Sequence, residues 1–381
     1  MGDASKPSVL IIGGLGFIGR FLAKHIHDND LASEYKIVDK QLPELACLAP
    51  EFAEACSSKK FIQGDMSRQH TAEKILTRAD GSTWDYVFNC GGDQRFAQDE
   101  EVYKQQSLAL STTAAREAAK QKVKCWVELS TGAIYKPDRE PRKETDKVKP
   151  WQRVAKYKLE AENELQKIEG LPLVILRLPN VYGEYGSKTV GTLLCMARVY
   201  AHLNEEMKWL WTKDLRTHTV HVRDVARAMF HVANWYATGK KGWRSEWGTT
   251  PIFNLVDHGD TSQGTMQTLI SQIFPIKTGF HGTIVSQFAK MNLNFAVDEE
   301  NDEILHPWGE LLKEAGIKRP GPITPYLEQE HVRDSDLSLD GTRFETVTGF
   351  GYDVERVTEQ GLRDIVKSYE KMKWWPPMEL K

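Results

Sequence analysis

A glycine-rich stretch near the N-terminus has the residue types and spacing to bind phosphate groups. The apolar run 9–12 leads into glycines at positions 13, 14, 16 and 19, after which apolar residues return with helical spacing. Gly13 would let the chain turn sharply, Gly16 would let the backbone approach a pyrophosphate, and Gly19 would let a helix pack closely on a strand. The helix would direct its free N–H groups at the phosphates. The stretch therefore predicts a dinucleotide-binding turn, with an incidental glycine-rich turn as the alternative.

An acidic residue follows at the distance that such a site requires. Asp39 follows the predicted strand residues 35–38, roughly 20 residues beyond the glycines, where a carboxylate can accept hydrogen bonds from the adenosine ribose. The same carboxylate would repel a 2′-phosphate. NAD is therefore the predicted cofactor, and Lys40 and Arg20 are the residues that keep NADP as an alternative.

The elements that must position these residues alternate along the first half of the chain. Strands are expected at 9–12, 35–39, 60–66, 84–92, 124–131 and 171–177, and helices at 71–78, 100–120 and 154–168. A loop and a helix are expected over 42–58. Such alternation favours an α/β fold, a Rossmann-like doubly wound parallel sheet with helices on both faces.

The second half of the chain loses this alternation after Gly183. Helices are expected at 189–203, 224–235 and 359–371, and strands at 208–211, 217–222 and 251–256. We predict two domains from this change. Residues 7–182 with 217–257 would form the NAD-binding Rossmann domain, and residues 183–216 with 258–381 a smaller, mixed α/β C-terminal substrate lobe.

Composition narrows the classes of partner. The 381 residues are 40% hydrophobic and 27% charged, as in an ordinary globular protein, and the net charge of -3 gives no general attraction to nucleic acid or anionic membranes. The five cysteines lack the spacing of a disulfide framework or a metal site. No apolar stretch is long enough to cross a bilayer. We therefore expect a cytoplasmic protein without a metal and without a membrane partner.

The segment 136–158 is dense in charge. It holds nine basic residues against four acidic ones. It could attract phosphate groups at the rim of a site, or it could be a solvated loop with mixed charges. RNA binding through this segment is the least favoured function, because the chain lacks a basic face interleaved with aromatic residues.

Six motifs follow one another along the chain, at 13–19, 64–66, 130–135, 158–162, 177–183 and 220–228. Together they resemble the extended short-chain dehydrogenase/reductase family, the NAD-dependent epimerase/dehydratase group, whose members act mostly on nucleotide sugars. The resemblance covers nearly the whole chain. It implies NAD as cofactor and a small-molecule substrate of the nucleotide-sugar kind. Members often dimerise through two helices, so a homodimer through helices 100–120 and 154–168 is the candidate assembly.

The resemblance also implies which residues form the site. Candidate cofactor-binding residues are Gly13, Gly16, Phe17, Ile18, Gly19, Asp39, Lys40, Asp65, Met66, Cys90, Gly91, Gly92, Lys158 and Pro179. Asn180 and Arg216 are candidate substrate-binding residues. Arg216 lies one residue from the place where the family has a phosphate-binding arginine, which Thr217 occupies here. On a strand that offset turns a side chain to the opposite face, so Arg216 would bind phosphate only across a bulge, and a solvent-facing arginine is the alternative.

The proton-transfer residues depart from the family pattern. The family uses a tyrosine one helical turn before a lysine, whose charge lowers the phenol pKa from about 10 toward neutrality. Thr131 occupies the Ser/Thr place and Lys158 the lysine place, but the tyrosine place holds Val154, which cannot exchange a proton. Tyr157, three residues later, could reach the pocket edge as a substitute base or be an ordinary amphipathic tyrosine.

Further departures leave two functions open. Leu108 stands where members place an active-site Asn, and residues 132–133 replace the acidic pair of dehydratases, which argues against dehydration. His221 and Asp224 are expected to stabilise the turn into the following helix. The chain would be an enzyme in which Thr131, Lys158 and either Tyr157 or water relay the proton. Alternatively, it would be a catalytically silent NAD(H)-binding sensor or scaffold.

Overall fold

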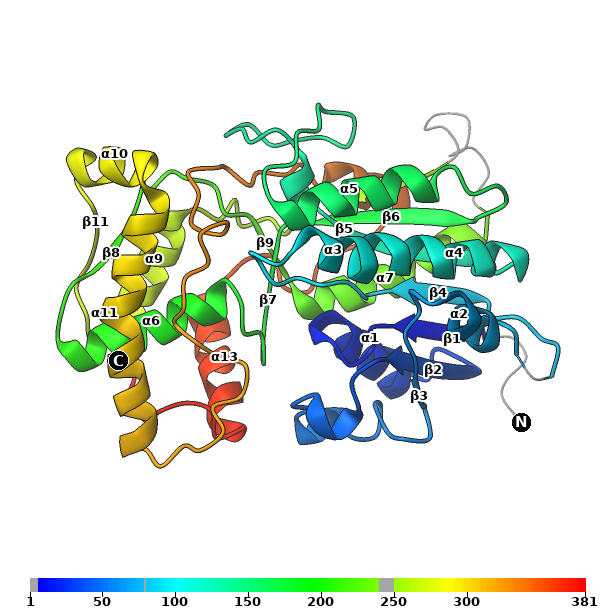
Figure 1. Ribbon diagram of the computed structural model, residues 1–381, viewed down its shortest axis with the longest axis horizontal. Coiled ribbons are helices and arrows are strands. Elements are labelled where there is room, and N and C mark those ends of the chain that lie inside the picture. The colour runs from blue at the N-terminus through cyan, green and yellow to red at the C-terminus, as the bar shows by residue number, and fades with distance from the viewer. Residues whose placement is uncertain (1–5, 79, 240–249) are drawn as a thin grey trace.

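The computed structural model describes residues 6–78, 80–239 and 250–381, and it is built on a central sheet of seven parallel strands (Figure 1). The order across the sheet is β10-β6-β5-β4-β1-β2-β3. The strands are β1 (Ser8–Ile12), β2 (Glu34–Asp39), β3 (Phe61–Gln63), β4 (Tyr86–Asn89), β5 (Cys125–Thr131), β6 (Leu173–Leu178) and β10 (Ile252–Asn254). The expected Rossmann-like α/β fold is confirmed. Residues 240–249 of the predicted first domain lie outside the described part of the chain.

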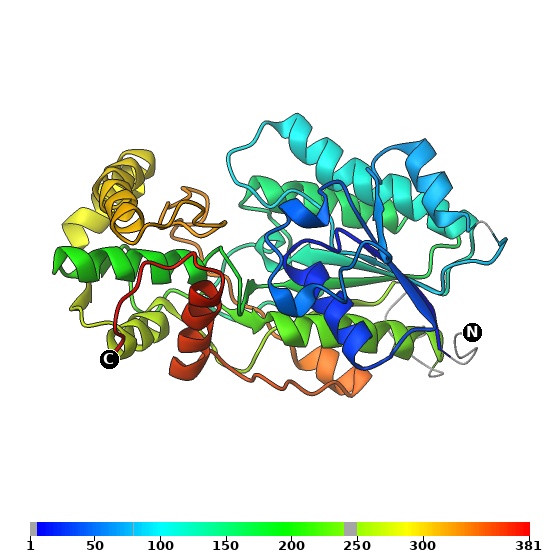
Figure 2. The same ribbon diagram turned by 90° about the horizontal axis from the view of Figure 1, so that it is seen from below.

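Helices cover both faces of the sheet (Figure 2). One face carries α1 (Phe17–Asp28) and α7 (Val222–Ala237), and the other carries α2 (Gln69–Leu76), α4 (Leu110–Lys120) and α5 (Arg153–Leu165). Because side chains alternate along a strand, Val9 and Ile11 of β1 enter one hydrophobic cluster while Leu10 and Ile12 enter another. Burial on both faces explains why these strands are almost continuously apolar in sequence.

Two expected helices differ from the prediction. Segment 42–58 contains only the short 3₁₀ turns η1 (Pro43–Leu45) and η2 (Pro50–Phe52), each begun by a proline that cannot lie inside a longer helix. The helix expected over 100–120 is divided into α3 (Glu100–Tyr103), a π-helical stretch η3 (Lys104–Ala109) and α4. No glycine or proline marks that division, so local sequence signals do not predict it.

The remaining elements form a smaller body beside the sheet, on the left in Figure 1. Its helices are α6 (Val190–Leu203), α9 (Gln263–Ile273), α10 (Thr283–Met291), α11 (Leu293–Glu314) and α13 (Glu359–Lys371), while α12 (Thr342–Thr348) packs by β10. Two parallel pairs complete it, β8 (Met207–Trp209) with β11 (Thr278–Phe280) and β7 (Asn180–Tyr182) with β9 (Thr219–His221). The strands expected at 208–211 and 217–222 therefore pair with other strands rather than with each other.

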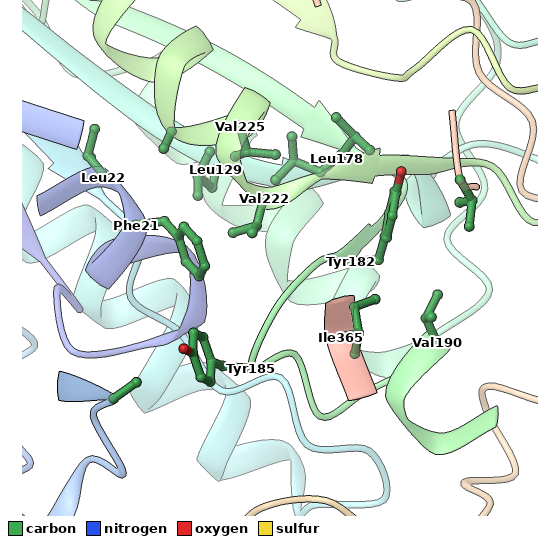
Figure 3. Packing of buried hydrophobic residues seen from close by; sticks show 14 of the residues in the cluster. Phe21, Leu22, Leu129, Leu178, Tyr182, Tyr185, Val190, Val222, Val225 and Ile365 are labelled. Atoms are coloured by element: carbon green, nitrogen blue, oxygen red, sulfur yellow. The ribbon is translucent and has the colours of Figure 1, made fainter. Parts of the chain in front are cut away.

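A single hydrophobic cluster connects the sheet to this smaller body (Figure 3). It contains Phe21 of α1, Leu129 of β5, Leu178 of β6, Val190 of α6 and Ile365 of α13. The smaller body is thereby packed at the carboxyl ends of the central strands. Among the described residues, no helix has the length and apolar character needed to cross a membrane.

Candidate functional site

The turns after β1 and β4 meet at the carboxyl edge of the sheet. The amide of Gly13 donates to the Val38 carbonyl oxygen at 2.8 Å, and the amide of Cys90 donates to the Ile12 carbonyl oxygen at 2.9 Å. Gly13 has a φ of 70°, and a Cβ there would lie 2.7 Å from the Gly91 backbone. Only glycine fits both requirements, so the predicted sharp turn lies directly against the Gly91–Gly92 turn.

The N-terminus of α1 is open toward this edge. Gly16 precedes the helix without a side-chain cap, and the first turn contains no acidic residue. A Cβ on Gly19 would lie 2.4 Å from the Gly13 carbonyl oxygen, which explains the close packing of helix on turn. Phe17 and Ile18 begin the helix. Uncapped N–H groups beside a glycine turn are a suitable cradle for the phosphates of a dinucleotide.

Asp39 closes the far side of this cradle. Its carboxylate accepts hydrogen bonds from the amides of Leu15 at 3.2 Å and Gln41 at 3.1 Å, at the carboxyl end of β2. The Arg20 guanidinium donates to the carbonyl oxygens of Leu15 at 2.7 Å and Ala46 at 3.0 Å. The Arg20 guanidinium is therefore held by backbone carbonyl oxygens. Asp39 remains as the charged group that would face the adenosine ribose.

Three further predicted residues lie around the neighbouring strand ends. Lys40, which follows β2, donates a hydrogen bond to the Gln106 side chain in the π-helical stretch η3. Asp65 follows β3 and accepts from the amide and hydroxyl of Ser67, at 3.1 Å and 2.6 Å, while the Met66 side chain is buried. Asp65 thus fixes its own turn, and Met66 can offer only its backbone to a ligand.

Lys158 reaches from α5 into the ends of β4 and β5. Its ammonium donates to the carbonyl oxygen of Leu129 at 2.9 Å and of Gly91 at 3.4 Å, and only 4% of the residue is exposed. A Cβ on Gly92 would lie 3.4 Å from both the Lys158 ammonium and the Ser107 hydroxyl. The Ser107 hydroxyl is buried without a hydrogen-bond partner among the described residues. Two polar groups therefore converge on a glycine turn, which fits the ribose beside a nicotinamide.

The other two predicted catalytic residues, Thr131 and Tyr157, lie in different environments. Thr131, two residues beyond Leu129 on β5, accepts a hydrogen bond from the Ala133 amide at 3.2 Å. Val154 is 4% exposed and packs with Tyr103, Tyr157 and Phe96. The Tyr157 ring stacks on Tyr103 at 5.8 Å between centroids. Burial, followed by Glu100, raises the pKa of Tyr157.

The predicted substrate residues lie at the start of the smaller body. Asn180, which follows the buried Pro179, donates to the His218 carbonyl oxygen through its backbone at 3.1 Å and its side chain at 3.2 Å. Arg216 forms an ion pair with Asp260 at 3.1 Å. The neighbouring Thr217 lines the cavity described next and Arg216 does not.

A cavity of about 450 Å³ lies between α6, α10 and α11. Its mouth includes Arg95 and Phe96, which follow the Gly91–Gly92 turn in sequence. The lining is largely apolar, and carboxylates of α11 also take part in it. Apolar lining residues include Leu193, Met196, Trp209, Met266 and Phe288, and the carboxylates include Glu300 and Glu303. The cavity can therefore accommodate a small molecule.

The segment 322–336 crosses from the cavity to α5. The Glu330 carboxylate accepts the Arg153 amide at 2.8 Å and so caps the N-terminus of α5. His331 hydrogen-bonds the Thr189 hydroxyl at 3.1 Å and contacts the Phe96 ring. Sequence reasoning missed this segment, because nothing local to it indicates a partner so far away in the chain.

Sequence reasoning also missed Glu128, although the signal was present. Glu128 is a charged residue inside the otherwise apolar strand β5, which a fully covered parallel sheet does not normally tolerate without partners. By contrast, His221 has the expected role at the turn into α7, whereas Asp224 holds a segment far away in the chain. His221 accepts the Arg223 amide at the start of α7, and the Asp224 carboxylate accepts two amides from residues 353 and 354.

Comparison with known proteins identifies the family. The sequence model of the NAD dependent epimerase/dehydratase family matches residues 9–246, well over half of the chain. The chain belongs to this family, as the six motifs implied. The family is NAD dependent, which confirms NAD as the expected cofactor. None of the curated proteins matched the chain in sequence.

Solved structures share the fold over nearly the entire chain. Pal from Bacillus thuringiensis is 17% identical, with a TM-score of 0.65 over 96% of this chain and 98% of its own. UDP-N-acetylglucosamine 4-epimerase from Methanobrevibacter ruminantium, in complex with UDP-N-acetylmuramic acid, is 17% identical with a TM-score of 0.61 over 97% and 98%. UDP-glucose 4-epimerase from Thermus thermophilus, in complex with NAD, is 18% identical with a TM-score of 0.61 over 95% and 99%.

Proposed function

We propose that this chain binds NAD(H) and acts on, or binds, a nucleotide-sugar-like small molecule in the cavity lined by Phe96 and Thr217. The proton transfer would not use a tyrosine at position 154. The observation that carries the proposal is the pair of residues on α5. Lys158 donates into the ends of β4 and β5, whereas Val154, one helical turn earlier, is buried among aromatic rings and has no proton to exchange.

The roles of the remaining residues follow from their positions. Lys158 would hold the nicotinamide ribose beside Gly91 and Gly92, and Thr131 would orient the substrate hydroxyl. NAD, when bound, supplies hydride transfer to or from the substrate carbon. The raised pKa of Tyr157 makes its phenol a poor base at neutral pH. The proton would therefore pass either through water, which relays it to solvent, or through Tyr157.

A catalytically silent NAD(H)-binding sensor or scaffold is the second candidate function, and the same valine favours it. Loss of a general base typically costs ~10²–10⁴ in rate. A protein that has lost its base and kept its cofactor cradle could report NAD(H) rather than consume it. Binding without turnover on a panel of nucleotide sugars would decide for this function.

Restoring the missing phenol tests the proposal. We expect Val154→Tyr to raise epimerisation or NAD reduction on a panel of UDP- and dTDP-sugars by about 10²–10⁴, because the phenol would stand one turn before Lys158. Val154→Phe is the matched control, since it adds the same ring without the hydroxyl. Equal rates for the two variants, or efficient turnover by the wild type, would contradict the assigned role of position 154.

A further inference from the structure

A carboxylate lies in the middle of the central strand β5. Glu128 is 1% exposed and faces α4 and α5. Its oxygens accept hydrogen bonds from the Asn89 amide at 3.0 and 2.8 Å, the Ser111 hydroxyl at 2.8 Å and the Trp126 indole at 3.0 Å. All of these donors are neutral. They satisfy the lone pairs of the carboxylate but leave its charge without a counter-ion.

The Lys158 ammonium supplies that counter-ion. Its nitrogen lies 3.8 Å from a Glu128 oxygen, and the two side chains are 5% and 1% exposed. The separation is too long for a hydrogen bond, and the ammonium donates instead to the carbonyl oxygens of Leu129 and Gly91. The carboxylate therefore acts on the lysine through its charge, in a setting where water screens little.

Position 154 explains why the lysine needs this partner. A tyrosine there could become a phenolate and balance the ammonium from the α5 side. Val154 and the neighbouring rings of Tyr103 and Tyr157 offer no such charge. A buried ammonium without an anion is costly and tends to lose its proton. Glu128 balances the charge from β5, on the face of the sheet that α5 covers.

We propose that Glu128 is a positioning residue that keeps Lys158 charged and directed at the Gly91–Gly92 turn, in place of the phenolate that position 154 cannot supply. This inference rests on the proposed function, because the Gly91–Gly92 turn is where Lys158 would meet the nicotinamide ribose. Glu128 would act through Lys158 rather than by contact with cofactor or substrate.

Other groups near the ammonium do not replace this charge. In the part of the chain that the structure describes, the Lys158 charge acts on two titratable groups, Glu128 on β5 and the Cys90 thiol just after β4. Burial raises the pKa of Cys90, which leaves the thiol neutral. Burial also raises the pKa of Glu128, and Lys158 opposes that rise. The π-helix and α4 contribute the neutral hydroxyls of Ser107 and Ser111.

The pH dependence of NADH binding by the full chain tests the inference. Glu128→Gln keeps the shape of the side chain and removes its charge. We expect wild-type affinity, measured by nicotinamide fluorescence, to hold to higher pH than in this variant, whose affinity should be at least tenfold weaker at pH 9 and near normal at pH 6.5. Glu162→Gln is the matched control, because Glu162 is an equally buried carboxylate, which lies on α5 and pairs with Arg177 instead of Lys158. Its pH profile should follow that of the wild type.

A double-mutant cycle with Lys158→Met separates charge coupling from general damage. If Glu128 acts through the ammonium, Glu128→Gln should not weaken NADH binding further once Lys158 is methionine. An equal loss in both backgrounds, or an unchanged pH profile in Glu128→Gln, overturns the inference. Wild-type protein that fails to bind NADH at any pH instead refutes the proposed function.

A second readout needs neither NADH nor a folded Glu128→Gln protein. In Lys158→Met the carboxylate loses its counter-ion, so Glu128 should take up a proton at neutral pH. A protonated-carboxyl band should then appear in the infrared difference spectrum between variant and wild type. Its absence would show that the two groups are not coupled and would overturn the inference.

Discussion

His221 shows how burial decides the role of a titratable side chain. The residue is 6% exposed, its ring contacts Tyr182 edge-on, and its nitrogen accepts the Arg223 amide at the start of α7. Burial, followed by the Arg223 charge, lowers the pKa of His221 to about 4. A histidine that stays neutral at physiological pH and caps a helix acts in structure rather than in proton transfer.

This pKa predicts how acid affects stability. In the unfolded chain a histidine titrates near about 6.5, so between about pH 6.5 and 4 the unfolded state binds the proton that the folded state excludes. We expect His221 to contribute a loss of about 3 kcal/mol in the free energy of unfolding as the pH falls through this window. His221→Asn keeps an acceptor at the cap and should flatten the loss in urea titrations at pH 7 and pH 4.5. The same change at His306, whose side chain is 79% exposed, should leave it intact.

At the scale of single elements, the glycine turn and α1 act together. The turn brings uncapped N–H groups of α1 to the edge of the sheet, where Asp39 faces them. Gly16 and Gly282 both precede a helix in extended conformation, yet a Cβ at Gly16 would lie 3.1 Å from the Gly13 carbonyl oxygen whereas Gly282 has open space. Substitutions at the two positions can therefore be compared. Both replace a glycine that precedes a helix, but only the one at Gly16 would affect ligand binding at the glycine turn.

We expect Gly16→Val to abolish the stabilisation that NAD confers. At a concentration 100 times its Kd, NAD should stabilise the wild type by about 2.7 kcal/mol, seen as a rise in Tm. Gly282→Val should retain the full rise. A normal NAD-dependent rise in Gly16→Val would argue against pyrophosphate binding at this turn.

Sequence reasoning succeeded for elements whose signals are local. The strand, glycine turn and helix at 9–28 each depend on neighbouring residues, and the final helix was expected at 359–371, where α13 lies. Sequence reasoning failed where the local structure depends on contacts with residues far away in the chain. The π-helical stretch before α4 has no local breaker, and Glu330 caps a helix that begins 177 residues earlier. The pairing of Glu128 with Lys158 is a tertiary contact of the same kind, although a charge within an apolar strand did indicate that some partner was needed.

At the scale of the whole molecule, the segment 322–336 ties the cavity to the helix that carries Lys158. Glu330 caps α5, while Trp211 donates to the Val332 carbonyl oxygen at 2.7 Å and His331 reaches Thr189 near α6. Residues 327, 328, 331 and 332 of the same segment also line the cavity. A ligand in the cavity therefore contacts the segment that holds the start of α5.

We expect Glu330→Ala to weaken both stability and cofactor binding. Loss of the cap should reduce the free energy of unfolding by about 0.5–2 kcal/mol. The first turn of α5 should then loosen and displace Lys158, so that the Kd for NADH rises severalfold in fluorescence titrations. Glu328→Ala removes a carboxylate from the same segment but leaves the capping bond in place, so it should change the Kd little. Equal changes of the Kd in the two variants would show that the Glu330 cap does not influence cofactor binding.

The hydrophobic cluster that runs from Phe21 through Tyr182 to Ile365 also governs how the chain can be divided. A cut between residues 182 and 183 would separate partners that now bury one another and would leave two halves with apolar surfaces in water. We therefore expect the chain to unfold as one cooperative unit and its two halves not to fold separately.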